Sequence, residues 1–236
     1  MKNLLFPIFL LPGIAAFPQK VIDVGKQDVR VTSSMFYVAG GRPVSIAKYV
    51  KVVSGTPYFS DNWMYGRVEL ADGHLYDSVK LKLDLADNSV LFLAPDSTEM
   101  IATASIKDVT LIDASTGKEY FFIFSSFIKA TGNVETGWYQ VLGTGKATIC
   151  KLVEKRIEEM KPYGSATFEE NIATVNRYFV FINSVLSAIK KFKDLPDILS
   201  DKKVDLKKYI SNKKLTGKTD EDYADLVMYY NGLVTK

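Results

Sequence analysis

The sequence predicts a mainly β protein with a helical C-terminus. Antiparallel meanders and hairpins are expected to form a curved sheet, a sandwich or a partly open barrel, and a helical hairpin to follow. Three observations lead to this prediction. Hydrophobic and charged residues alternate within residues 55–93, turn-forming residues recur about every eight to fifteen positions, and the composition changes at Lys193. We therefore divide the chain into a leader, residues 1–16, a β body, residues 17–192, and a helical segment, residues 193–236.

The clearest pattern lies at residues 79–85, where apolar and charged side chains alternate. The apolar positions are Val79, Leu81, Leu83 and Leu85, and the charged positions are Lys80, Lys82 and Asp84. Successive side chains of a strand point to opposite faces, so the pattern predicts a strand with one buried face. A second alternating run, residues 67–70, precedes it, and Asp72-Gly73 between the two is a strong hairpin signal. A break at residues 86–89 returns the chain into residues 90–93, which completes an antiparallel meander.

Further strands are expected where β-branched and aromatic residues cluster between turn residues. They cover residues 29–38, 45–53, 101–111, 120–124, 138–142, 146–153, 175–182 and 185–189. With the meander they give about ten to twelve short strands, as in curved sheets and sandwiches. A charged stretch, residues 154–161, follows the strand expected at 146–153 and ends at Pro162.

Two helices are expected at the C-terminus. The first covers residues 201–211 and can be capped by Ser200, and the second begins after Thr219 and stops at Asn231-Gly232. The second helix carries one apolar stripe at the spacing i, i+3, i+4 and i+7, formed by Tyr223, Leu226, Val227 and Tyr230. Two short helices bury too little surface to be stable alone, so the stripe must pack on the β body or on a partner.

The first residues are typical of a secretory signal peptide. Lys2 is followed by an apolar run, LLFPIFLL, and then by a helix breaker and small residues. The run is far shorter than the roughly 20 residues that span a bilayer. Cleavage is expected near residues 15–17, and no cysteine near that site offers a lipid anchor. The sequence therefore predicts an exported chain, periplasmic or extracellular, with no transmembrane span after cleavage.

Composition argues against several kinds of chemistry. A net charge of +3 with dispersed basic residues does not favour nucleic acid. The only cysteine, Cys150, can form no internal disulfide, and its apolar neighbours indicate a buried thiol. The only histidine, His74, follows the expected hairpin turn and is interpreted as a surface residue. We therefore expect no metal, no cofactor and no catalytic residues, although a pair of carboxylates remains open.

One group of residues suggests a binding surface. Four aromatic residues lie close together in sequence around the polar stretch Ser60-Asp61-Asn62; they are Tyr58, Phe59, Trp63 and Tyr65. Aromatic rings on a sheet edge, with polar side chains between them, could form a platform for a glycan or a peptide. Alternatively, the rings fill the open end of the sheet as part of the core.

Three stretches together carry a family resemblance. They are KVVSGTPYF leading to Trp63 and an Asp-Gly hairpin, the run WYQVLGTGKATICKL followed by Lys161-Pro162-Tyr163, and the lysine-rich helix leading to Tyr229-Tyr230-Asn231. In this order they resemble a family of uncharacterised exported envelope proteins of Gram-negative bacteria. The resemblance covers most of the chain after residue 45 and implies export and a β-then-helix order. The family has no assigned activity, so it implies no site residues. Gly143-Thr144-Gly145 stands where a shorter, more polar hairpin turn is expected.

Taken together, these features predict an exported, non-catalytic binding or scaffold protein of the cell envelope. Its partner is open: an envelope protein, a glycan or an apolar ligand. One alternative is a carrier that holds a lipid or other apolar ligand inside the β body. The other is a carboxylate-based hydrolase. A hollow apolar interior would favour the carrier. Two converging acids in a cleft would favour the hydrolase, and a filled core with exposed aromatic rings would favour the binding protein.

Overall fold

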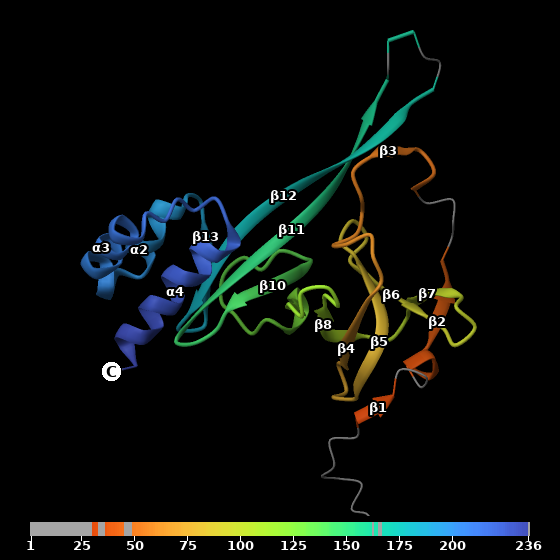
Figure 1. Ribbon diagram of the computed structural model, residues 1–236, viewed down its shortest axis with the longest axis horizontal. Helices are drawn as coiled ribbons and strands as arrows, with labels where there is room; N and C mark the ends of the chain where they lie inside the picture. The colour runs from red at the N-terminus through yellow and green to blue at the C-terminus, as the bar shows by residue number, and fades with distance from the viewer. Residues whose placement is uncertain (1–29, 33–35, 45–48, 162, 165–166, 236) are drawn as a thin grey trace, which may run out of the picture.

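A computed structural model describes residues 30–32, 36–44, 49–161, 163–164 and 167–235. The expected signal peptide, residues 1–16, lies outside this part of the chain. The predicted fold class is confirmed: the described residues form a single antiparallel-rich sheet that does not close, followed by helices at the C-terminus (Figure 1).

The sheet has thirteen strands in the part of the chain that is described. Their order is β13-β12-β11-β10-β9-β8-β4-β5-β6-β7-β2, with β1 paired to β5 and β3 paired to β12. The strands are β1 (Arg30–Thr32), β2 (Gly41–Pro43), β3 (Val52–Ser54), β4 (Met64–Leu70), β5 (Leu75–Asp84), β6 (Ser89–Leu93), β7 (Glu99–Ala102), β8 (Ile106–Ile112), β9 (Glu119–Phe124), β10 (Trp138–Gly143), β11 (Ala147–Met160), β12 (Glu169–Ile182) and β13 (Val185–Ile189).

The predicted meander is present as β4, β5 and β6. Asp72-Gly73 turns the chain between β4 and β5, and Gly73 adopts a φ of 91°, which explains the glycine there. The four apolar residues of the alternating run are all buried, in a meander core shared with β6, β8 and β9. This core consists of Phe36, Val68, Leu70, Tyr76, Val79, Leu81, Leu83, Leu85, Val90, Phe92, Ile106, Val109, Leu111, Phe122, Trp138 and Val153.

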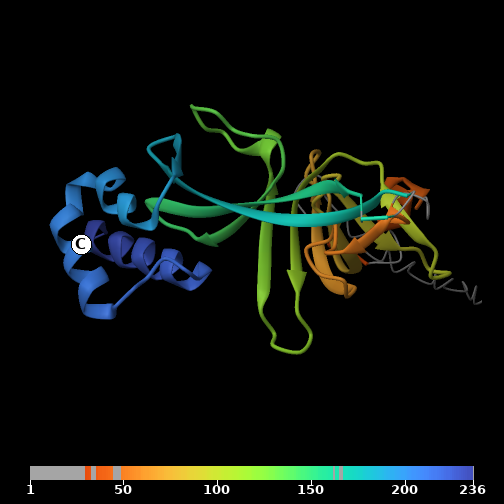
Figure 2. The ribbon, with the colours of Figure 1, turned by 90° about the horizontal axis from the view of Figure 1, so that it is seen from above.

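The C-terminal helices pack on the other end of the sheet, as Figure 2 shows from above. They are α2 (Leu195–Ile198), α3 (Lys203–Lys213) and α4 (Asp220–Val234), with short 3-10 turns at Phe192–Asp194 and Ser200–Lys202. The predicted stripe of α4 is buried in a helix core, against side chains of β11, β12 and β13. These sheet residues are Ala147, Ile149, Val180 and Ile189. Of the two partners expected for the stripe, the chain's own sheet is the one observed.

The start of α4 follows a local sequence signal, whereas a residue near its end makes tertiary contacts instead. Thr219 caps α4 as predicted, since its hydroxyl accepts a hydrogen bond from the N–H of Asp222 at 3.2 Å. The predicted stop at Asn231-Gly232 is wrong, because α4 continues to Val234. The Asn231 amide instead bonds the β10–β11 hairpin: its Oδ1 accepts from the Ala147 N–H, and its Nδ2 donates to the Ala147 C=O, both at 2.8 Å.

Several other predicted boundaries are corrected. Of the strand expected over residues 29–38, the described part contains β1, while Tyr37–Ala39 forms a 3-10 turn and residues 29 and 33–35 lie outside the described part. The strand expected over residues 45–53 is reduced in the described part to the start of β3, and residues 45–48 lie outside it. Ser200 sits in a 3-10 turn and does not cap α3, whose first residue is Lys203.

The largest difference concerns the charged residues 154–161, for which no strand was expected. Residues 154–160 of this stretch continue β11, which pairs with β12 in unbroken register over fourteen residues each. The neighbouring strand β10 pairs with β11 only as far as Leu152, so the hairpin beyond that point projects from the sheet as a two-stranded arm (Figure 1). Strand β3 borders the β12 side of this arm.

Candidate binding groove

The four aromatic residues singled out in the sequence do not form one surface. Phe59 packs into the meander core, with its ring edge-on to Tyr120 and Phe122 at centroid distances of 5.0 and 4.9 Å. Tyr65 is half exposed and its partner is Lys80, whose Nζ lies 5.5 Å from the ring centroid. Phe59 therefore belongs to the core, as the alternative interpretation expected, whereas Tyr65 lies at a separate place on the surface.

Tyr58 and Trp63 do come together. The Nζ of Lys82 lies 4.8 Å from the Tyr58 ring centroid and 4.9 Å from that of Trp63. Such cation–π contacts favour holding the two rings around the ammonium group. The ring of Tyr49 lies edge-on to Tyr58, with centroids 6.3 Å apart. The predicted platform is thus reduced to Tyr58 and Trp63 and gains Tyr49.

Tyr58 and Tyr49 line an open groove of about 460 Å³ on the face of the sheet opposite the meander core. Among the described residues, its lining consists of Arg42, Val44, Tyr49, Val50, Tyr58, Asp84, Asp87, Leu91, Glu99 and Ile101. Strand register explains how they meet. Ile101 of β7 pairs with Arg42 of β2 on one side and Leu91 of β6 on the other, so these three side chains share one face.

Asp84 forms the floor of the groove and is the exception to the alternating pattern of β5. It belongs to the charged set, yet only 3% of it is exposed. Its Oδ1 accepts hydrogen bonds from the N–H groups of Ala86 and Asp87, both at 3.0 Å, and its Oδ2 accepts from the Tyr49 hydroxyl at 2.7 Å. A buried carboxylate needs such partners to offset its lost hydration. Asp84 therefore fixes the turn after β5 and orients Tyr49.

The two tyrosines are held in their neutral form. Burial raises the pKa of Tyr49 far above its usual range, and the hydrogen bond to Asp84 raises it further. Burial also raises the pKa of Tyr58, with the charge of Asp84 as the next cause. At neutral pH both rings are thus uncharged aromatic groups with a polar edge.

The charges of the groove are unequal. Among the described residues, the lining contains one basic side chain, Arg42, and three acidic ones, Asp84, Asp87 and Glu99. Asp84 is already engaged by hydrogen bonds within the protein. Within the described residues, no cluster of three or more histidine, cysteine or acidic side chains could hold a metal ion.

Two residues considered for chemistry lie where the sequence predicted. His74 is exposed on the β4–β5 hairpin, with its Nδ1 3.0 Å from Asp72 Oδ1. Cys150 is buried, and this burial raises the pKa of its thiol to about 12. A thiol with that pKa carries almost no thiolate at neutral pH and is a poor nucleophile.

The groove also contains residues that sequence reasoning missed. Arg42 and Glu99 had no local signal, since their strands are short and far apart in the chain. Asp84 had one: an acidic residue that ends an alternating strand, directly before a turn, is a candidate to accept hydrogen bonds from that turn.

Comparisons with protein-family models, with curated proteins and with solved structures find no match for this chain. Within the described residues, no helix combines the length and the apolar character needed to cross a membrane.

Proposed function

We propose that this chain is an exported, non-catalytic binding protein of the cell envelope, and that its ligand occupies the groove over Asp84. The observation that carries the proposal is the groove itself, where Tyr49 and Tyr58 meet polar side chains from β2 and β7. Its volume of about 460 Å³ lies in the range of roughly 300–1,000 Å³ that is common for ligand sites.

The chemistry of the lining selects a class of ligand. Two neutral aromatic rings and the apolar side chains of Leu91 and Ile101 suit the flat, apolar face of a sugar ring. Arg42 and Glu99 can bond its hydroxyl groups as donor and acceptor. Because acids outnumber bases among the described lining residues, a neutral or amino sugar fits better than an acidic one. We therefore propose a short neutral or amino-bearing glycan as the ligand.

The two alternatives have less in their favour. The sheet does not close, and the apolar side chains of the described residues pack against one another in clusters rather than around a lumen. This gives a lipid carrier no support. For a hydrolase, the acids of the groove would have to act on a substrate, but both oxygens of Asp84 already accept hydrogen bonds from the protein.

Binding can be tested by NMR titration of the full mature chain with three disaccharides: one neutral, one built of amino sugars and one containing a uronic acid. The first two should shift the amide signals of Arg42, Leu91 and Ile101, and the acidic one should bind least. Tyr58→Leu should weaken binding about fivefold by removing a ring face. Tyr65→Leu, an exposed aromatic residue outside the groove, is the matched control. Shifts confined to other surfaces, or equal losses in both variants, would contradict the proposal.

Export is tested separately by intact-mass measurement of the protein from its native host. The mature chain should lack residues 1 to about 16, as the signal-peptide pattern predicts. A chain that keeps Met1 in the cytoplasm would refute export and leave the groove as a site for a cytoplasmic ligand.

A further inference from the structure

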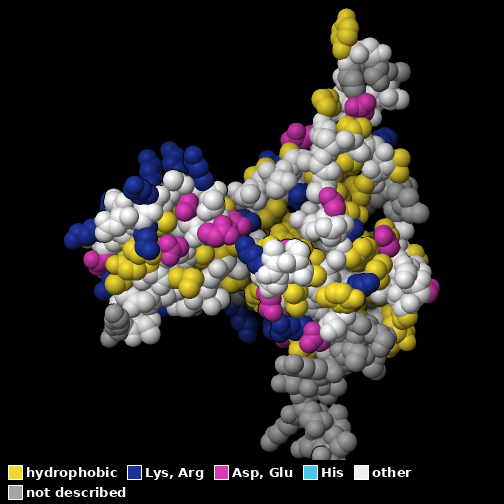
Figure 3. Space-filling view, in the orientation of Figure 1, with side chains coloured by type: hydrophobic (Ala, Val, Ile, Leu, Met, Phe, Trp, Pro, Cys, Tyr) yellow, Lys and Arg dark blue, Asp and Glu magenta, His cyan; other side chains and the backbone are white. Residues whose placement is uncertain are grey.

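The arm carries an open strand edge. Strand β10 ends its pairing with β11 at Leu152, and within the described residues no other strand pairs with that edge of β11 beyond it. The opposite edge of the arm is bordered by β3. Residues 156–161 of this edge are all exposed, and Figure 3 shows that the arm projects from the body with only separate hydrophobic side chains on its surface. An unpaired edge of this kind can add a strand from another chain.

The backbone direction on this edge follows from one hydrogen bond. The N–H of Glu170 donates to the C=O of Lys51 at 2.9 Å, so it points away from β11. Glu170 lies opposite Glu159 in the antiparallel ladder. Because the N–H of Glu170 points away from β11, the two residues form a non-hydrogen-bonded pair, in which the N–H and C=O groups of each residue point away from the other strand. By alternation, the N–H and C=O groups of Lys155, Ile157 and Glu159 all point to the open edge.

The charges along this edge are complementary to those of a second copy of the same segment that runs in the opposite direction. Read in order, residues 155–159 are Lys, Arg, Ile, Glu and Glu. If a second β11 pairs antiparallel about Ile157, each Lys155 lies opposite a Glu159 and each Arg156 opposite a Glu158. The two Ile157 side chains, each 45% exposed in the single chain, then cover one another. Lys155, Ile157 and Glu159 form the hydrogen-bonded pairs of this register.

Neighbouring registers are disfavoured. Centring the pairing on Arg156 places Arg156 against its own copy and Glu154 against Glu158. Centring it on Glu158 places the two Glu158 side chains together. Like charges directly opposite each other destabilise a sheet. The length of the open edge gives the same centre. The edge runs from Val153, just beyond the last residue paired with β10, to Lys161 at the turn, and Ile157 lies midway between them.

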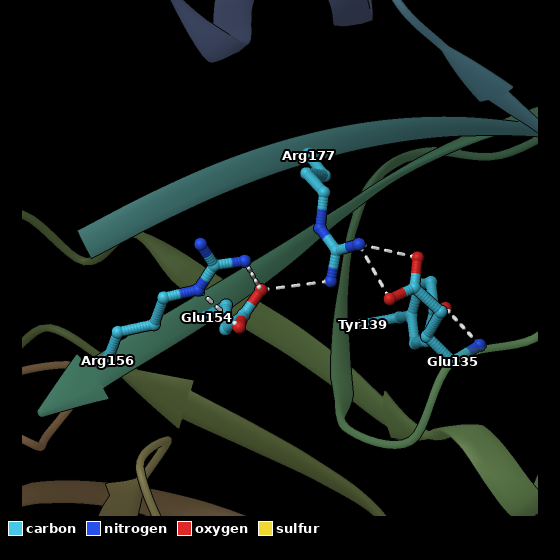
Figure 4. A network of polar contacts seen from close by, with 5 residues as sticks. All are labelled: Glu135, Tyr139, Glu154, Arg156 and Arg177. Atoms are coloured by element: carbon cyan, nitrogen blue, oxygen red, sulfur yellow. Dashed lines mark hydrogen bonds and ion pairs between the residues drawn. The ribbon is translucent and has the colours of Figure 1, made fainter. Parts of the chain in front are cut away.

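A network of hydrogen bonds and ion pairs, here called the brace, holds the base of the arm in place in the single chain (Figure 4). Arg177 of β12 donates from Nη1 to both carboxylate oxygens of Glu135 at 2.6 Å and from Nη2 to Glu154 at 3.0 Å. Arg156 donates from Nε to the same Glu154 at 2.6 Å. These bonds tie the arm to the loop before β10. They keep the direction of the edge fixed, which lowers the ordering cost of pairing.

We propose that two copies of this chain associate through their arms, with the β11 edges paired antiparallel about Ile157. The occupant of the edge is the same segment of a second copy, because its charge pattern matches only when reversed. The interface is isologous, so each contact occurs twice around the twofold axis. None of residues 155–159, which this register pairs, lines the groove.

Sedimentation of the full mature chain over a range of concentrations tests the dimer, using two single variants and their mixture. Lys155→Glu and Glu159→Lys each place like charges opposite one another and should lower the association constant about tenfold or more. An equimolar mixture should associate again, since the two variants restore opposite charges in every pair. Lys207→Glu, on exposed α3, is the control for net charge.

Hydrogen exchange gives a second, independent readout. The amides of Lys155, Ile157 and Glu159 should gain protection as the concentration rises, while their neighbours, bonded to β12, stay protected throughout. A chain that remains monomeric to about millimolar concentration, a dimer unaffected by both variants, or a mixture that fails to associate would each overturn the proposal. The saccharide titration is unaffected by any of these results.

Discussion

Two hairpins of the same sheet, β4–β5 and β11–β12, form strands for different reasons. In β4–β5, apolar and charged residues alternate, and the apolar face fills the meander core. In the outer half of β11–β12, the residues of β11 are mostly charged and exposed, yet the pairing with β12 continues without a shift. A strand can therefore be specified by burial of one face or by continuation of a ladder that starts elsewhere.

The difference has consequences for stability and for function. A hairpin held by a core contributes to the free energy of unfolding through each buried side chain. An arm held by backbone pairing and a few ion pairs contributes little, but it presents its edge to solvent. The ion pairs of Arg177 lie where the core-packed part of the sheet ends and the exposed arm begins.

The largest expected contrast is between one apolar residue from each hairpin. Leu83→Ala should lower the free energy of unfolding by about 2–5 kcal/mol, because Leu83 is buried and its removal leaves a cavity. Ile157→Ala should cost less than about 0.5 kcal/mol, because Ile157 is 45% exposed. Urea denaturation at a concentration where the chain is monomeric measures both. Similar costs would mean that the arm is also packed against a core.

A smaller effect separates the brace from an ordinary surface ion pair. Arg177→Met should cost about 1 kcal/mol, because this guanidinium joins Glu135 and Glu154 in one network. Arg67→Met should cost less than about 0.5 kcal/mol, since Arg67 meets Glu119 at 3.3 Å on the exposed side of the meander. Thermal unfolding at low and high salt would compare them, and an equal loss in both variants would remove the special role of the brace.

The last effect depends on pH and concerns Asp108 of β8, which lies beside Lys107 and Glu69. Burial, with the charge of Glu69 as the next cause, raises the pKa of Asp108 to about 6. Between the unfolded pKa of about 3.8 and this value, the folded chain holds a proton that the unfolded chain has lost. The contribution of Asp108 to the free energy of unfolding therefore falls as the pH rises through this window.

Asp108→Asn should remove that loss. The shift corresponds to at most about 3 kcal/mol, and solvent screening at this partly exposed site reduces it, so the variant should be more stable than the wild type by about 1 kcal/mol at pH 7 and equal to it near pH 3.5. Denaturation curves between pH 3.5 and pH 7 measure the difference. A constant offset at all pH values would show that Asp108 acts through packing and not through its charge.

The sequence by itself determined the elements whose cause is local. Alternation predicted β5, Asp72-Gly73 predicted its hairpin, and Thr219 predicted the start of α4. Export remains a prediction from the first residues, which lie outside the described part of the chain. In each of these cases the signal and the structure it specifies lie within a few residues of each other.

Tertiary structure decided the rest, because its causes are contacts between distant parts of the chain. Asp84 is buried since Tyr49 and the turn after β5 satisfy its carboxylate. The groove exists because β2, β6 and β7 align Arg42, Leu91 and Ile101 on one face. Residues 154–160 are a strand because β12 offers a continuous row of peptide groups opposite them. Backbone pairing leaves almost no trace in side-chain pattern, so only the folded chain could reveal the arm.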